Sequence, residues 1–168
     1  MHMLVIVKAA LEGVGEMASK AGNEKNLCHC TALRKASRRV SQIYDSALEP
    51  YGLRITQRAI LNQIARSGTP MIGELAEALV MDRGALAHNL KPLERDGLVE
   101  IRADPKDRRN RLVALTAVGR KKLEETATAW KRAQDGFEKA FGVVKSPSLR
   151  KALEFIVSDE FAVAFRHG

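Results

Sequence analysis

The stretch Asp104-Pro105-Lys106-Asp107-Arg108-Arg109-Asn110-Arg111 places a cationic loop tip between two short runs of alternating apolar residues, 98–103 and 112–115. Alternation with a period of two indicates β-strands, and the turn-forming Asp-Pro and Arg-Asn pairs between them predict a hairpin. The stretch from 102 to 111 contains five basic residues and two aspartates, so it carries a net positive charge. Such a tip is typical of a wing that enters a phosphate-lined groove, whereas an isolated charge run is more often only solvated surface.

Two short amphipathic helices are predicted just before this hairpin. Apolar residues recur at i, i+3, i+4 and i+7 from Ile72 to Leu79, and at i, i+4 and i+7 from Leu86 to Leu93. The break Val80-Met81-Asp82 separates the two patterns, which are those of helices with one buried face. Helix, tight turn, helix and hairpin in this order predict a winged helix-turn-helix.

The pattern D-P-x-D-R-R-x-x-L-V-x-L-T-x-x-G from Asp104 to Gly119, with residues 90–99 and 52–57, resembles the MarR family of bacterial transcription regulators. The resemblance covers residues 27–166. It implies a mainly α fold, a winged helix-turn-helix with a small β-hairpin wing and terminal dimerisation helices. The expected organisation is an N-terminal extension at 1–26 and a single domain at 27–166, with dimerisation helices at 27–50 and 117–166 and the winged helix-turn-helix at 55–116.

The composition agrees with one basic globular domain. The chain has 168 residues, of which 45% are hydrophobic, so it can bury a substantial core. Its net charge of +8 favours an anionic partner, and nucleic acid fits better than a membrane because no apolar run approaches the length of a membrane span. The apolar stretch at residues 1–7 is too short and wrongly flanked for a secretory signal. Two cysteines suit a reducing compartment, so a cytoplasmic location is expected.

Apolar stripes at helical spacing predict further helices outside the winged segment. One stripe runs from Leu27 to Ala47, a second follows Thr116 as the expected N-cap of one long helix reaching Phe141, and Ser146-Pro147 is expected to open a last helix with Ser146 as its N-cap. These helices carry more apolar surface than a small winged domain covers. A twofold homodimer through them is therefore expected, and the alternative is that they fold back on their own subunit.

The second helix of the motif offers three side chains suited to DNA. Arg83 suits a guanine edge, His88 can donate or accept in the major groove, and Lys91 suits a phosphate. The small residues at 84, 85 and 87 depart from the usual Ser, Thr and Arg of the family, which favours shape readout or contacts with thymine methyl groups. Pro92 predicts either a bend or a packing role, and we favour packing.

Resemblance assigns roles within the wing. Arg109 matches the family's arginine that enters the minor groove, and Asp107 matches the acid that braces the loop, the alternative being an ordinary turn-forming aspartate. Arg108 and Arg111 are expected at phosphates, and Lys106 completes the predicted DNA-binding set.

Cys28-His29-Cys30 is the segment that suggests redox chemistry. In a helix, residues two apart point about 160° away from each other, so these cysteines would share neither a metal nor a disulfide, and no metal site is predicted. The segment resembles the organic-hydroperoxide-sensing branch of the family, in which Cys30 would be the sensor and Tyr44 its hydrogen-bond partner. A second tyrosine of that branch is Arg34 here. The favoured alternative is that Cys30 packs in a dimer interface.

No motif of a hydrolase, kinase or nucleotide-binding enzyme occurs, and neither catalytic residues nor a cofactor are predicted. We predict a homodimeric regulator of transcription, a repressor that leaves a pseudo-palindromic operator when a small aromatic or acidic ligand binds. The candidate ligand-binding residues are Arg34, Tyr44, Tyr51 and Trp130. The alternatives are a redox-sensing repressor acting through Cys30 and a winged helix that docks on protein.

Overall fold

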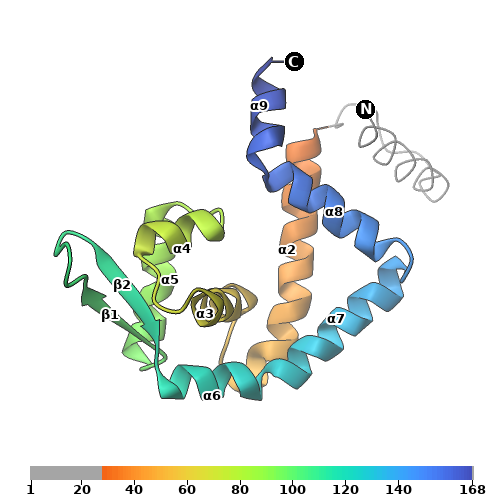
Figure 1. The fold of residues 1–168 in the computed structure, drawn as a ribbon. Helices are drawn as coiled ribbons and strands as arrows, with labels where there is room; N and C mark the ends of the chain where they lie inside the picture. The colour runs from red at the N-terminus through yellow and green to blue at the C-terminus, as the bar shows by residue number, and fades with distance from the viewer. Residues whose placement is uncertain (1–27, 168) are drawn as a thin grey trace. The chain divides into compact units, whose positions relative to one another are not determined.

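The computed structural model describes residues 28–167, so the predicted N-terminal extension at 1–26 lies outside the described residues. The elements are α2 (His29–Leu48), the 3-10 turn η2 (Glu49–Tyr51), α3 (Ile55–Ser67), α4 (Ile72–Ala78), α5 (Arg83–Arg95), β1 (Val99–Ala103), β2 (Arg111–Leu115), α6 (Ala117–Glu125), α7 (Ala127–Phe141), α8 (Ser146–Val157) and α9 (Asp159–His167) (Figure 1). The described residues form two compact units, one at 34–135 and one that joins residues 28–33 with 136–167.

The unit at 34–135 contains the winged helix-turn-helix. α3, α4 and α5 contact one another, and the antiparallel hairpin of β1 and β2 follows α5 (Figure 1). The strands pair from Val99 opposite Leu115 to Ala103 opposite Arg111, and Met71 forms one further bridge to Leu112 just before α4. The predicted mainly α fold with a small hairpin wing is confirmed.

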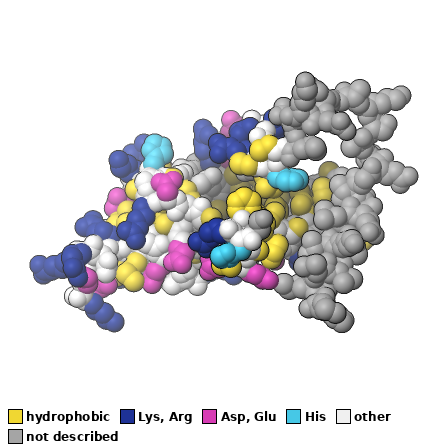
Figure 2. Space-filling view, turned by 90° about the horizontal axis from the view of Figure 1, so that it is seen from above, with side chains coloured by type: hydrophobic (Ala, Val, Ile, Leu, Met, Phe, Trp, Pro, Cys, Tyr) yellow, Lys and Arg dark blue, Asp and Glu magenta, His cyan; other side chains and the backbone are white. Residues whose placement is uncertain are grey.

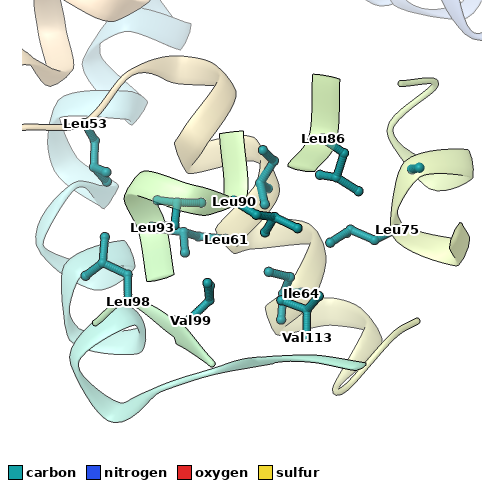
Figure 3. Close-up of a cluster of buried hydrophobic side chains, with 12 residues drawn as sticks. Leu53, Leu61, Ile64, Leu75, Leu86, Leu90, Leu93, Leu98, Val99 and Val113 are labelled. Atoms are coloured by element: carbon teal, nitrogen blue, oxygen red, sulfur yellow. The ribbon is translucent and has the colours of Figure 1, made fainter. Parts of the chain in front are cut away.

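Alternating and helical apolar positions meet in a single core beneath this motif. Leu61 and Ile64 of α3 lie among buried leucines of α5 and Val113 of β2, all in one cluster (Figure 3). Leu86, Leu90 and Leu93 are each at most 1% exposed, as their spacing on one helix face predicts. Burying each such side chain stabilises the fold by about 1.5–3 kcal/mol, so this cluster holds α5 in place.

Short side chains fix where two of the helices begin. The Asp82 carboxylate accepts a hydrogen bond from the Ala85 backbone N–H at 2.8 Å and starts α5. The Thr116 hydroxyl accepts one from the Gly119 N–H at 2.9 Å and starts α6, as predicted. Pro92 lies inside α5, which continues past it to Arg95 without interruption.

The terminal helices differ from the sequence-based expectation in two places. The predicted long helix from Thr116 to Phe141 is interrupted at Thr126, which separates α6 from α7. The predicted last helix is also divided, because Ser158 takes an extended conformation between α8 and α9. Its hydroxyl accepts a hydrogen bond from the Phe161 N–H at 3.3 Å, which starts α9.

Ser146 is not the N-cap of α8, as was expected, but its first helical residue. Its hydroxyl donates to the Gly142 carbonyl at 3.0 Å, and Lys145 stands in the cap position with helical backbone angles. The chain already turns helically before Ser146, so the hydroxyl reaches back by one turn and is not free to cap.

Large apolar side chains stay exposed on the terminal helices. Ile43 of α2, Val157 of α8 and Phe165 of α9 are 53%, 58% and 78% exposed, whereas Tyr44 and Leu48 on the inner face of α2 are buried. The apolar stripe predicted for α2 is therefore only partly covered within one chain.

Candidate nucleic-acid interface

The face of α5 opposite its buried leucines is open. Arg83, Gly84, Ala87, His88 and Lys91 are all exposed on it. A Cβ atom built at Gly73 would lie 3.5 Å from Arg83 Nη2, so the Arg83 guanidinium extends over α4. Arg83 is the first residue of α5, the second helix of the helix-turn-helix, which we call the recognition helix. Because the residues between the long side chains are small, the backbone of α5 can approach a groove closely.

The tip of the wing is folded by its own polar groups. The Asp104 N–H donates to the Asn110 carbonyl at 3.0 Å, and the Asn110 N–H donates to the Asp107 carbonyl at 2.9 Å. The Asp104 carboxylate accepts a hydrogen bond from the Lys106 N–H at 2.9 Å. These bonds are those of a stable turn built by aspartates, so the tip is a defined structure.

Asp107 and Arg109 form a bidentate pair at this tip. Arg109 Nε and Nη2 donate to the two Asp107 carboxylate oxygens at 3.0 Å each, and the Arg109 backbone N–H donates at 3.1 Å. The hydrogen bond from Arg109 holds the pKa of Asp107 below its usual range, and the same contact raises the pKa of Arg109. The Arg109 side chain is 90% exposed, so its remaining donors face solvent.

Other cations surround this pair. Arg102, Lys106, Arg108 and Arg111 are exposed on the strands and the loop. Figure 2 shows Lys and Arg side chains projecting from the end of the molecule at which Figure 1 places the hairpin. The wing therefore presents concentrated positive charge on a narrow projection.

The four predicted ligand-binding residues have different surroundings. Tyr44 is buried, and its hydroxyl donates to Gln134 Oε1 at 2.8 Å. The Trp130 ring lies against the Arg58 guanidinium, and the Tyr51 carbonyl accepts a hydrogen bond from Lys122 Nζ at 3.4 Å. Arg34 is exposed and stands ten residues before Tyr44 on α2, which is about 15 Å along the helix.

Arg58 was not predicted from the sequence, although its guanidinium lies against the ring of Trp130, one of the predicted ligand-binding residues. It interrupts the apolar face of α3, since it lies three residues before the buried Leu61. A charged residue at a position with core spacing was the available signal, but the spacing did not show which groups would surround it.

The two cysteines flank the start of α2. Cys28 precedes the helix and Cys30 lies in its first turn, and both thiols are free and exposed. A hydrogen bond with Thr31 lowers the pKa of the Cys28 thiol. Because Cys28 lies outside the helix, the angle of about 160° expected between two helical side chains does not apply to this pair.

Two further features are absent from residues 28–167. No group of three or more His, Cys, Asp or Glu side chains there is arranged to hold a metal ion. None of the helices in that range is long and apolar enough to cross a membrane.

Comparison with known proteins defines the class of this fold. A family model described as MarR family matches residues 51–110. The crystal structure of the Mycobacterium tuberculosis transcriptional regulator MosR in complex with DNA is 33% identical, with 83% of this chain and 98% of that chain covered and a TM-score of 0.73. A mutant of E. coli MarR complexed with operator DNA is 22% identical, with 76% and 92% of the two chains covered and a TM-score of 0.69.

Among characterised sequences, the transcriptional activatory protein BadR of Rhodopseudomonas palustris is 37% identical over 93 residues. The match covers 54% of this chain and 53% of BadR, so it spans about half of that protein. The architecture is that of a winged helix-turn-helix transcription regulator. The chain belongs to the MarR family.

Proposed function

We propose that this chain binds double-stranded operator DNA as a homodimer and regulates transcription. The observation that carries the proposal is Arg109, which Asp107 holds in place at the cationic tip of the wing. The exposed face of the recognition helix α5 lies in the same compact unit. The MosR structure, which contains DNA, supports the same use of the shared fold. An intact cationic wing argues against the alternative of a protein-docking module.

In this proposal α5 lies in the major groove and the hairpin follows the adjacent backbone. Arg83 contacts a guanine edge, His88 contacts a base, and Lys91 contacts a phosphate. Arg109 enters the minor groove with its guanidinium oriented by Asp107, while Lys106, Arg108 and Arg111 contact phosphates. A twofold dimer would then read a pseudo-palindrome with half-sites about 10 bp apart.

The decisive experiment measures binding to the DNA upstream of the chain's own gene by fluorescence anisotropy. Arg109→Ala should abolish tight binding and leave the unfolding midpoint unchanged, because the side chain is exposed. Arg95→Ala is the matched control, since Arg95 is also an exposed arginine paired with a neighbouring aspartate. Equal affinities of the wild type and Arg109→Ala would refute the wing assignment.

Lys91→Ala provides a second measurement on the recognition helix. Loss of one phosphate contact should weaken binding to all sequences alike and lower the log-log salt slope by about one unit. A loss of sequence preference instead would place Lys91 at a base edge.

We further propose that the operator-bound form is a repressor released by a small aromatic or acidic molecule. Arg34, Tyr44, Tyr51 and Trp130 remain the candidate binding residues, with Arg58 added because its cation lies against the Trp130 ring. Thermal shift with a panel of aromatic acids and their thioesters tests the ligand, and anisotropy with each stabilising compound tests release. The activatory role in the name of BadR makes in vitro transcription necessary, and a rise in transcript on adding the protein would mean an activator.

A thiol switch at Cys30 is the second candidate function, and the free, exposed thiol of Cys30 in the first turn of α2 favours it. A stoichiometric dose of hydroperoxide should release DNA if Cys30 is the sensor, and Cys30→Ser should then block release while Cys28→Ser does not. We expect no release at that dose, because Arg34 replaces a tyrosine of the sensing branch. Release that depends on Cys30 would favour the switch.

A further inference from the structure

Arg58 is a buried cation. Neither the hydrophobic core nor the proposed DNA interface explains why a charged side chain is buried at this position. Its side chain lies inside the winged unit, and the residue is 9% exposed. Its Nε donates to Thr126 Oγ1 at 3.2 Å, and its guanidinium carbon lies 4.6 Å from the centroid of the Trp130 ring. No carboxylate in residues 28–167 forms an ion pair with it.

These two contacts lie on either side of a helix break. Thr126 is the one residue between α6 and α7 and is fully buried, while Trp130 lies in the first turn of α7. The Thr126 hydroxyl also donates to the Leu123 carbonyl of α6 at 2.8 Å. Arg58 therefore joins α3 to the end of α6 through Thr126 and to the start of α7 through Trp130.

The surrounding contacts place this junction between the winged motif and the first turns of α7. Before it, α6 follows the wing directly and contacts α3. One turn after Trp130, Gln134 accepts the hydrogen bond from Tyr44 of α2. Beyond residue 135, α7 continues into the other compact unit, which carries the exposed apolar helices α8 and α9.

An arginine is an unfavourable choice if the position needs only packing. Burial without a carboxylate penalises the charged form and lowers the pKa of Arg58. One neutral hydroxyl and one indole face are weak substitutes for a carboxylate, so we expect an unbranched apolar side chain of similar length to be about as stable here. The planar guanidinium makes the contact directional, because its edge must point at the Thr126 hydroxyl while its face covers the Trp130 ring.

We propose that Arg58 is a positioning residue that fixes the direction of the first turns of α7 within the winged unit at 34–135. We infer that this direction selects the operator spacing that the two winged units of the dimer read. The proposal rests on the dimeric DNA binding proposed above. One added base pair moves a half-site by about 3.4 Å and turns it by about 35°. A fixed distance between the two winged units of the dimer should therefore select one operator spacing. Without the Arg58 contacts the protein should tolerate several spacings.

The test measures affinity for a duplex series with identical half-sites at the preferred spacing of the wild type, at one base pair more and at one less, together with a single half-site. Arg58→Met keeps the length and packing of the side chain but removes the Nε–H donor and the charge. We expect the wild type to prefer one spacing by about tenfold or more, a preference comparable with a lost base contact. Arg58→Met should reduce this preference to within about threefold while binding the single half-site as before.

Two further variants separate direction from stability. Thr126→Val keeps the shape of Thr126 but removes the acceptor of Arg58, so it should reduce the spacing preference in the same way and serves if Arg58→Met does not fold. Arg58→Lys keeps the charge without the planar fork and should not restore the preference. A wild-type preference in Arg58→Met and Thr126→Val, whatever their melting temperatures, would overturn the positioning role. A wild type that binds no duplex would overturn the proposed function and this inference together.

Discussion

Two helices of the winged unit end with the same backbone geometry but with different residues. Val80 after α4 and Gly97 after α5 both have positive φ angles, 51° and 68°. In each case this residue and its successor donate hydrogen bonds back to the last helical turn, at 3.0 and 2.9 Å after α4 and at 2.9 and 2.8 Å after α5. Glycine adopts this conformation without strain, whereas a β-branched residue there costs about 1–2 kcal/mol.

Val80→Gly should therefore stabilise the protein. Val80 is 68% exposed, so little packing is lost, and relief of strain should exceed the entropic cost of glycine by about 0.5–1 kcal/mol. Urea unfolding at fixed protein concentration should show a higher midpoint with an unchanged slope. The reverse change, Gly97→Val, should lower the midpoint, and stabilisation by that change would contradict the argument.

The Asp107–Arg109 pair predicts how the wing responds to acid. The pKa of Asp107 is lowered in the folded state, so its contact with Arg109 is complete above the unfolded value of about 3.9 and is lost as the pH falls through the lower folded value. The Arg109 amide resonance should thus stay constant from about pH 8 to pH 5 and move only below about pH 4. A transition near neutral pH would mean that another group orders the tip.

The start of α6 is held against the hairpin by a very close approach of the two backbones. Gly119 is buried in the first turn of α6, and a Cβ atom at this position would overlap the Leu98 carbonyl and lie 2.9 Å from Leu115 Cδ1. The Thr116 hydroxyl donates to the Gly97 carbonyl at 2.7 Å and ties the start of α6 to the same turn. A backbone carbonyl cannot move aside as the end of a flexible side chain does.

Gly119→Ala should therefore destabilise the fold by about 1–3 kcal/mol, the usual cost of overpacking. Gly136→Ala is the matched control, because Gly136 lies in α7 and a Cβ atom there has open space around it. The control should gain about 0.5–1 kcal/mol from the better helix propensity of alanine. Chemical unfolding of both variants measures the contrast, and similar midpoints would show that α6 can shift away from the hairpin.

The sequence predicts an element best when local chemistry decides it. The hairpin and α5 follow from period-two and helical spacing, and both are found at the expected places in the chain. The division of the long helix does not follow, because Thr126 is held by a hydrogen bond from Arg58, which is 68 positions away in the sequence. Ser146 was mistaken for a cap because the pattern Ser-Pro carries no information about the helical turn before it.

The wing could be proposed as a site from the sequence because its residues are adjacent in the chain and exposed. Asp107 and Arg109 pair across two positions, and Arg83 to Lys91 lie on one helix. Arg58, Thr126 and Trp130 form a cluster only after α3 has packed against the end of α6. The spacing of residues along the chain therefore did not reveal that the charged side chain of Arg58 is buried against residues far away in the sequence.

The exposed apolar side chains of the terminal helices bear on the oligomeric state. Leu153, Ile156 and Val157 of α8 and Phe165 of α9 are between 37% and 78% exposed in a single chain. Exposed apolar surface of this kind favours an interface, and we expect a second copy of the chain to cover it in a twofold dimer. Removal of residues 144–168 should then abolish the dimer and leave monomer or aggregate.

A point variant tests this surface without deleting a helix. Val157→Lys should convert the dimer to monomer, because a lysine would be buried unpaired at the contact, while the isolated subunit tolerates it since Val157 is 58% exposed. Val118→Lys is the matched control, because Val118 is equally exposed but lies on α6 within the winged unit. Light scattering after size exclusion should give twice the 18.5 kDa chain mass for the wild type and the control, and 18.5 kDa for Val157→Lys. A dimer that survives both Val157→Lys and the truncation would place the contact on another surface.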